Sequence, residues 1–456
     1  MRDLTQGPIV GHLLGMAMFI GISLIFQTMY FIVDLYFVSR LGSAVIAGVS
    51  ASGNVFFLAL AASQLISIGV MATVAQAVGK KDEAEANLFS DQAISMSLLF
   101  GAVMLALGYA FGGIGVDALT ADAASAAAGR AYLFAFLPQL ALMFPVAAMT
   151  SALRGAGVTM PTMVLQTVTI LLNAALAPVL IAGWGTGIAL GAAGAGWASS
   201  ISAFVGTIAL IFMFPRVQKY LRLHLDSLRP KFSAWQRIIF IGLPTSLEFL
   251  LMFIVFIAIY FVIRPFGAEA QAGFGIGGRI MQSIFLPAMA IAFAAAPIAG
   301  QNFGAKRYDR VRETFTVTAL IGSAVMLTLS LLCHINPGIL ARPFTDDPAV
   351  LAVSNDYLQI VSWNFVFSGL LMAAGSLFQG MGDTRPSLFA SATRMLTFVV
   401  PVIWASQQPW FTLHDVWLIS VASVVAQCAL AMWLLFRTFK TKLAPATPAP
   451  IAAVAG

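Results

Sequence analysis

Charged residues are scarce in this sequence. Of its 456 residues only 9% are Asp, Glu, Lys or Arg, while 60% are hydrophobic. A soluble protein of this length could not cover its surface with so few charges. Apolar runs of at least about 18 residues recur along the whole chain, and each is long enough to cross a bilayer as a helix. The composition therefore excludes a soluble fold and predicts an all-α polytopic membrane protein.

Cysteine and the common catalytic motifs are also scarce or absent. Cys333 and Cys428 both lie in apolar runs, so we expect small core residues rather than a disulfide framework or a metal site. A phosphate-binding GxxxxGK[ST] loop is absent, which argues against ATP hydrolysis by this chain. Neither a paired-His motif nor a nucleophile–base constellation is present. We therefore expect no enzymatic activity, no metal and no cofactor.

Twelve apolar segments can be placed along the chain, and we interpret each as a membrane-spanning helix. Their residue ranges are 12–39, 47–78, 91–113, 130–154, 160–183, 190–214, 236–263, 272–301, 316–338, 355–379, 385–407 and 414–437.

Lys and Arg residues predict the orientation of these helices. With both termini inside, eighteen of the 24 Lys and Arg residues fall on the inner side. The outer side receives only Arg40, Arg130, Arg264 and Arg342. This asymmetry satisfies the positive-inside rule and predicts cytoplasmic termini.

The net charge of +6 is therefore a topology signal and gives no reason to expect a nucleic-acid partner. A basic linker at 215–235 is expected to lie along the anionic inner leaflet. The tail at 441–456 is rich in Ala and Pro, and we expect it to be disordered.

An internal repeat appears when the chain is shifted by 225 residues. Coincident pairs include Gly42 with Gly267, Gly53 with Gly278, Gln76 with Gln301, and RGAGVTMP from Arg154 with QGMGDTRP from Gln379. One register along so much of the chain indicates a duplication. Each copy holds six helices, an even number, so the two repeats are parallel. Two such lobes, at 1–214 and 236–440, are the plan of a transporter with its substrate cavity between the halves.

Several motifs resemble those of the multidrug and toxic compound extrusion (MATE) family. They are VDLYFVSRLG in the first helix, AQAVGKKD with its echo GQNFGAKR, and the paired turns RGAGVTMP and QGMGDTRP. The resemblance implies a V-shaped pair of six-helix lobes in the bacterial inner membrane. It also implies export of small amphipathic, often cationic compounds, driven by inward movement of H⁺ or Na⁺. We expect a monomeric antiporter.

A flippase for lipid-linked precursors is the alternative, since such flippases share a similar fold. A cavity for pyrophosphate lipids should be lined by several basic residues. Only Arg279 and Arg394 are available inside the predicted spans. This alternative is therefore the weaker one.

Asp34 is an acid in the apolar stretch YFIVDLYFVSRLG, and its repeat mate is Ile259. The resemblance places an acid of this motif in the cation-coupling site of the N-terminal lobe. A carboxyl group in low-dielectric surroundings holds its proton more tightly, so it can bind and release one near neutral pH. The alternatives are an acid snorkelling to the interface or a fixed hydrogen-bond anchor.

Asn173 is a second candidate for the cation-coupling site. The family often has an Asn followed four residues later by an Asp before a proline, but here that position is Ala177. Because Na⁺ prefers several oxygen ligands, the missing carboxylate favours H⁺ over Na⁺. Asn173 could equally form a hydrogen bond between helices.

Glu248 and Arg394 are charges inside the predicted spans of the second half. Counted from the outer ends of their helices, their depths match within roughly 3 Å, so we expect a buried ion pair or a substrate-cavity role. Some sodium-coupled relatives use a glutamate about one turn away, at Met252 here. Arg279, near the outer end of its helix, is a possible cavity residue, although snorkelling would also explain it.

Proline is also missing where many relatives have it, in the first helix. Pro244 lies in the seventh span, whereas its repeat mate in the first is Phe19. In the family this proline is linked to helix bending during the proton cycle. The bending mechanism is therefore not expected for this chain.

Overall fold

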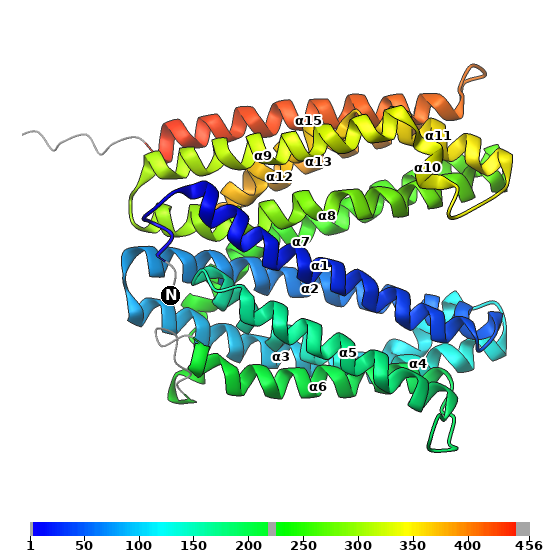
Figure 1. The fold of residues 1–456 in the computed structure, drawn as a ribbon, viewed down its shortest axis with the longest axis horizontal. Helices are drawn as coiled ribbons and strands as arrows, with labels where there is room; N and C mark the ends of the chain where they lie inside the picture. Colours follow the sequence, from blue (N-terminus) through cyan, green and yellow to red (C-terminus); the bar gives the residue numbers. More distant parts are fainter. Residues whose placement is uncertain (1–2, 218–224, 444–456) are drawn as a thin grey trace, which may run out of the picture.

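The computed structural model describes residues 3–217 and 225–443, and every regular element in these ranges is a helix (Figure 1). The first half contributes six long helices: α1 (Ile9–Ser39), α2 (Ser43–Lys80), α3 (Glu83–Leu119), α4 (Ala123–Gly155), α5 (Met160–Ala182) and α6 (Ala192–Val217).

The second half repeats this plan with more interruptions. Its elements are η1 (Leu225–Leu228), α7 (Phe232–Ile263), η2 (Arg264–Phe266), α8 (Ala268–Gly304), α9 (Tyr308–Ile335), α10 (Pro337–Ala341), α11 (Pro348–Val361), α12 (Asn364–Gly380), α13 (Arg385–Arg394), the π-helix η3 (Met395–Val399), α14 (Val400–Ala405) and α15 (Leu413–Lys442).

Within the described ranges, eleven helices are long and apolar enough to cross a membrane, and α11 with α12 makes a twelfth crossing if this pair, bent by 54°, is counted as one broken span. The prediction of an all-helical, twelve-span protein is thereby confirmed. The span expected at 355–379 is the broken one. The predicted linker and tail fall partly on 218–224 and on 444–456, which lie outside the described residues.

Local sequence signals set several helix ends. Asp82 caps α3 by accepting a hydrogen bond from the amide of Glu85, and Asp122 caps α4 by accepting one from Ser125. These side chains satisfy amides that have no partner within the helix. Lys81 and Lys306 adopt left-handed backbone angles, with φ of 60° and 58°. They are repeat mates at the 225-residue offset, so the duplication extends to the backbone.

The two halves touch at one end of the bundle and separate at the other. In Figure 1, α1 and α8 lie side by side near the N-terminus and diverge toward the opposite end. Every residue of α2 from Leu65 to Gly79 is buried, and so is every residue of α8 from Ala294 to Asn302. Near the other ends of these helices, a Cβ added at Gly53 or Gly278 would meet nothing within 4 Å. The structure is therefore a V that is closed at one end.

The closed end of the V carries Lys80, Lys81, Lys306 and Arg307, and we call it the basic end. The other is the open end. Because α2 and α8 are buried near the basic end, the two halves contact one another there. We call this contact between the halves the seam.

Helices α1 and α7 each pack against both halves. Near the basic end, Leu13 and Met16 of α1 pack on Ile291 and Ala294 of α8. Farther along, the Tyr30 hydroxyl of α1 lies within hydrogen-bond distance of Ser199 of its own half. In the same way, α7 begins against α2, with Ile238 packed on Leu65 and Ile66, and ends within its own half. Each first helix thus ties its half to the other.

Candidate functional site

Asp34 lies on α1 toward the open end, five residues before the helix ends at Ser39. Its side chain is 9% exposed, although the residues around it in sequence are apolar. Burial of an acid at this depth is costly, which makes the residue a functional candidate.

A chain of hydrogen bonds runs through four helices next to Asp34. The Tyr30 hydroxyl of α1 donates to Gln139 Oε1 of α4 at 3.2 Å and lies 2.5 Å from Ser199 Oγ of α6. Asn173 of α5 donates from Nδ2 to the same Ser199 oxygen at 3.2 Å. Asp34 follows Tyr30 by one helical turn and so lies on the same face of α1. We call these five residues the Asp34 cluster.

The Asp34 cluster retains spare hydrogen-bonding capacity. Among the described residues, Asp34 Oδ1 and Asn173 Oδ1 are buried and have no hydrogen-bond partner. A buried polar atom without a partner is uncommon, and it calls for a role such as binding an ion or a proton. Asp34 and Asn173 are thus brought together as expected, but through Tyr30 and Ser199 rather than by a direct bond.

Three members of the Asp34 cluster were not predicted from the sequence: Tyr30, Gln139 and Ser199. The position of Tyr30, four residues before the acid, was a usable signal because residues at this spacing share a helix face. Gln139 and Ser199 gave no comparable signal. Their nearness to Asp34 depends on how α4 and α6 pack around α1.

The expected ion pair between Glu248 and Arg394 does not form within the described part of the chain. Glu248 Oε1 of α7 is buried and has no hydrogen-bond partner among the described residues. Arg394 donates from Nη2 to Ser420 Oγ of α15 at 3.4 Å, and its guanidinium lies 5.8 Å from the centre of the Phe398 ring.

The depth of Arg394 was counted along a regular α-helix from the outer end of its span. The π-helix at Met395–Val399 lies between Arg394 and that end, so a constant rise of about 1.5 Å per residue does not hold there.

Arg279 of α8 has an exposed side chain, and its backbone carbonyl accepts a hydrogen bond from the Ser283 hydroxyl. Asp34 in the first half and Glu248 in the second each have a buried carboxyl oxygen without a hydrogen-bond partner among the described residues. Among the described residues, no group of three or more His, Cys, Asp or Glu side chains could hold a metal ion.

A family model for MatE matches the chain twice, at residues 20–179 and 244–404. The two matches cover well over half of the sequence and are offset by nearly the same distance as the internal repeat. The chain belongs to the MATE family.

Known MATE relatives are similar along nearly the whole chain. One is the "Probable multidrug resistance protein NorM" of Thermotoga maritima, 24% identical over 411 residues that make up 90% of this chain and 88% of the relative. Another is the "Multidrug export protein MepA" of Staphylococcus haemolyticus, 24% identical over 423 residues, 90% of this chain and 89% of the relative. The chain is thus a multi-pass membrane protein whose relatives are named for multidrug resistance and export.

Solved MATE structures share the fold. A structure described as the outward-facing conformation of a multidrug resistance MATE family transporter superposes with a TM-score of 0.88 at 20% identity, covering 96% of this chain and 98% of the other. A MATE crystal structure in the straight conformation gives a TM-score of 0.89 at 20% identity, with coverage of 96% and 98%.

One departure from the family pattern now has a structural context. Ala177, where the family often has an Asp, is fully buried in an apolar cluster with Val38 and Phe136. A carboxylate at 177 would lie one helical turn from Asn173. The Asp34 cluster therefore contains a single carboxylate.

Proposed function

We propose that the chain is a secondary active antiporter that exports small amphipathic or cationic compounds in exchange for H⁺. It would act as a monomer in the bacterial inner membrane, with the basic end facing the cytoplasm. The positive-inside rule supports this orientation, because Lys and Arg residues concentrate at that end. The observation that carries the proposal is the buried Asp34, whose Oδ1 has no hydrogen-bond partner within the described part of the chain.

The composition of the Asp34 cluster supports H⁺ over Na⁺. A hard cation needs several oxygen ligands in a defined cage. The cluster offers one carboxylate, and much of the remaining oxygen is engaged in the bonds among Tyr30, Gln139, Ser199 and Asn173. A proton needs only one acceptor atom, which Asp34 Oδ1 provides.

The proton would act by changing the partners of Asp34. Protonation removes the charge of Asp34 and turns its carboxyl group into a hydrogen-bond donor. Asn173 Oδ1, which has no hydrogen-bond partner among the described residues, is an acceptor within the same cluster. A proton that binds the two states of the transporter with different affinity shifts the equilibrium between them.

The test is export of a fluorescent lipophilic cation from proteoliposomes, with a pH gradient or a Na⁺ gradient imposed separately. We expect the parent protein to respond to the pH gradient. Asp34→Asn keeps the shape of the protonated acid but cannot release a proton, so we expect a folded protein that has lost gradient-driven export. Asp346→Asn, an exposed acid in the second half, serves as the matched control and should export normally.

Two results would contradict the proposal. Export by Asp34→Asn at the parental rate would make Asp34 a structural anchor. Export that follows only the Na⁺ gradient would overturn the choice of proton.

A further inference from the structure

Two glutamines form a crossed pair of hydrogen bonds at the seam. Gln76 of α2 donates from Nε2 to the carbonyl of Gly380, at the end of α12, at 3.0 Å. Gln301 of α8 donates from Nε2 to the carbonyl of Gly155, at the end of α4, at 2.9 Å. The 225-residue offset relates Gln76 to Gln301 and Gly155 to Gly380. Each bond joins one half of the protein to the other, and the two bonds are repeat mates.

The carbonyls that accept these bonds depend on the opposite half. Gly155 and Gly380 are the last residues of their helices, where carbonyl groups have no acceptor role within the helix. Within the described ranges, each carbonyl has its glutamine as hydrogen-bond partner and no other. Parting the halves at the basic end would leave two amides and two carbonyls to be hydrated together.

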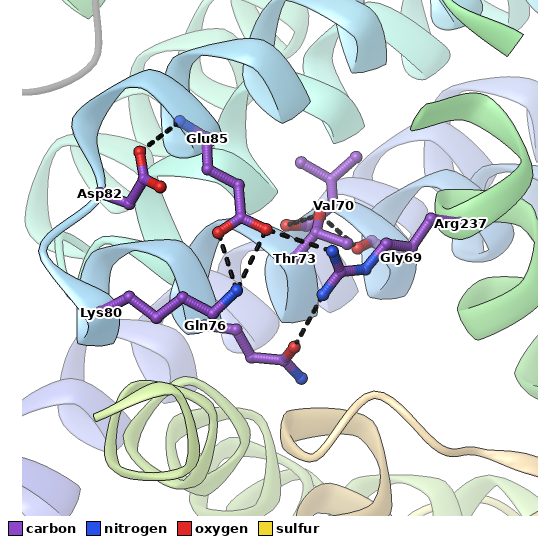
Figure 2. A network of polar contacts seen from close by, with 8 residues as sticks. All are labelled: Gly69, Val70, Thr73, Gln76, Lys80, Asp82, Glu85 and Arg237. Carbon is purple, nitrogen blue, oxygen red and sulfur yellow. Dashed lines mark hydrogen bonds and ion pairs between the residues drawn. The ribbon is translucent and has the colours of Figure 1, made fainter. Parts of the chain in front are cut away.

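Both glutamine side chains use their amide nitrogen and their amide oxygen in hydrogen bonds, and both are almost fully buried. Gln76 is 6% exposed, and its Oε1 accepts a hydrogen bond from Arg237 at 3.4 Å (Figure 2). Gln301 is 1% exposed, and its Oε1 accepts one from the backbone amide of Leu4 at 3.1 Å. Partners on both sides fix the direction of each amide group, so that its N–H points across the seam.

The chemistry of this contact suits a reversible closure. Neutral amides cost less to desolvate than charges, so the contact can form and break without the penalty of a buried ion pair. Water can replace a carbonyl partner at modest net cost. The backbones of α2 and α8 also approach closely here. A Cβ added at Gly79 would lie 2.0 Å from the backbone carbonyl oxygen of Gln301, and one added at Gly304 would lie 2.1 Å from the backbone carbonyl oxygen of Gln76.

We propose that Gln76 and Gln301 are the paired gating residues of the transport cycle, holding the halves together at the basic end. The inference rests on the proposed function in one respect: that the protein alternates between states open at opposite ends. Opening the basic end would then require both bonds to break in one step, because they cross the same seam.

The experiment measures the distance between the halves at the basic end. Spin labels at Ala84→Cys and Asp309→Cys, which are exposed repeat mates on α3 and α9, report this distance in lipid nanodiscs. Cys333 and Cys428 are buried and should not react. With the seam intact we expect mainly the short distance. Gln76→Met or Gln301→Met should raise the ratio of long to short distances about fivefold, and the double variant about 25-fold.

The controls separate gating from folding. Gln427→Met removes an amide bonded to Ser391 within the second half, and it should leave the distances unchanged. If a Met variant does not fold, Gln76→Asn with Gln301→Asn keeps the amide chemistry but shortens the reach, and it should open the seam likewise. Parental distances in a folded double variant, Met or Asn, would overturn the inference.

Failure of the proposed function would be distinguishable, because this measurement uses neither substrate nor ion gradient. A shifted distance with no export under any gradient would contradict the antiporter proposal alone. Normal export with unshifted distances in the double variant would contradict the gating proposal alone.

Discussion

Alanine at the two seam glycines should force the basic end open. A Cβ at Gly79 would lie 2.0 Å from the Gln301 carbonyl oxygen, and ordinary van der Waals contact begins at 3.4 Å. The backbones of α2 and α8 must therefore move apart by about 1.4 Å at this point. The same argument applies at Gly304, where the distance to the Gln76 carbonyl oxygen is 2.1 Å.

The expected magnitude follows from the cost of overpacking, typically about 1–3 kcal/mol for each added group. Gly79→Ala combined with Gly304→Ala should thus destabilise the closed basic end by about 2–6 kcal/mol. Even the lower limit changes the ratio of closed to open basic ends by about 30-fold. Labels at Ala84→Cys and Asp309→Cys should then report mostly the longer distance.

The same two helices supply a matched control. Gly53 and Gly278 are also repeat mates on α2 and α8, but an added Cβ at either meets nothing within 4 Å. Alanine is favoured over glycine inside a helix by roughly 0.5–1 kcal/mol, so Gly53→Ala with Gly278→Ala should raise the thermal unfolding temperature slightly. The distance between the labels should not change. If the seam pair behaved like this control pair, the close approach of α2 and α8 would be refuted.

Two further predictions concern charges outside the membrane spans. The backbone amide and side chain of Ser125 donate hydrogen bonds to Asp122, which holds the pKa of this carboxyl group below its ordinary value. The Asp122 cap therefore stabilises α4 fully above about pH 4, and this stabilisation is lost as the pH falls through the lowered pKa. Hydrogen exchange of the amides in the first turn of α4 should become faster over that pH range. Asp122→Asn should remove this pH dependence. Glu85 pairs with Lys80 at 2.8 Å and Arg237 at 3.1 Å (Figure 2), and because these pairs are partly exposed, Glu85→Gln should cost less than about 1 kcal/mol of unfolding free energy. That cost should vanish in high salt, whereas the effect of Gln76→Met should persist; a Glu85→Gln effect that salt does not change would contradict the surface assignment.

The sequence predicted the features that follow from composition and from position along a helix. Apolar length gave the twelve spans, and the 225-residue offset gave the duplication. An acid in an apolar helix made Asp34 a candidate before its surroundings were visible. Each of these inferences depends only on the positions of residues along the sequence.

Features that depend on helix packing could not be predicted in this way. Glu248 was expected to pair with Arg394, but Arg394 donates to Ser420 of α15, and the relative position of these helices is set by packing. Gln76 and Gln301 coincided in the repeat, yet nothing in the sequence showed that their amides cross to Gly380 and Gly155. Such contacts become visible only when both halves are placed together.

The architecture suggests how the Asp34 cluster can influence the seam. Helix α1 begins against α8 of the other half, where Leu13 and Met16 pack on Ile291 and Ala294, and it carries Asp34 near its other end. Its repeat mate α7 contains Pro244, but α1 contains no proline over its 31 residues. A helix without a proline lacks the usual cause of a sharp kink.

A rearrangement around Asp34 would therefore be transmitted along α1 as a tilt or shift of the whole helix. The end of α1 that moves against α8 lies beside the Leu4 amide, which donates to Gln301 Oε1. Gln301 is thus reached from the Asp34 cluster through α1, the short non-helical segment of residues 4–8 before it, and one hydrogen bond. Gln76 is held instead by Arg237 of α7. If the proposed function holds, the ion-dependent step would therefore act first on the Gln301 side of the seam. The duplication thus gives the seam two repeat-related hydrogen bonds, one from Gln76 and one from Gln301. Asp34 has no acidic counterpart on α7, so in the proposed cycle protonation would affect the Gln301 bond more directly than the Gln76 bond.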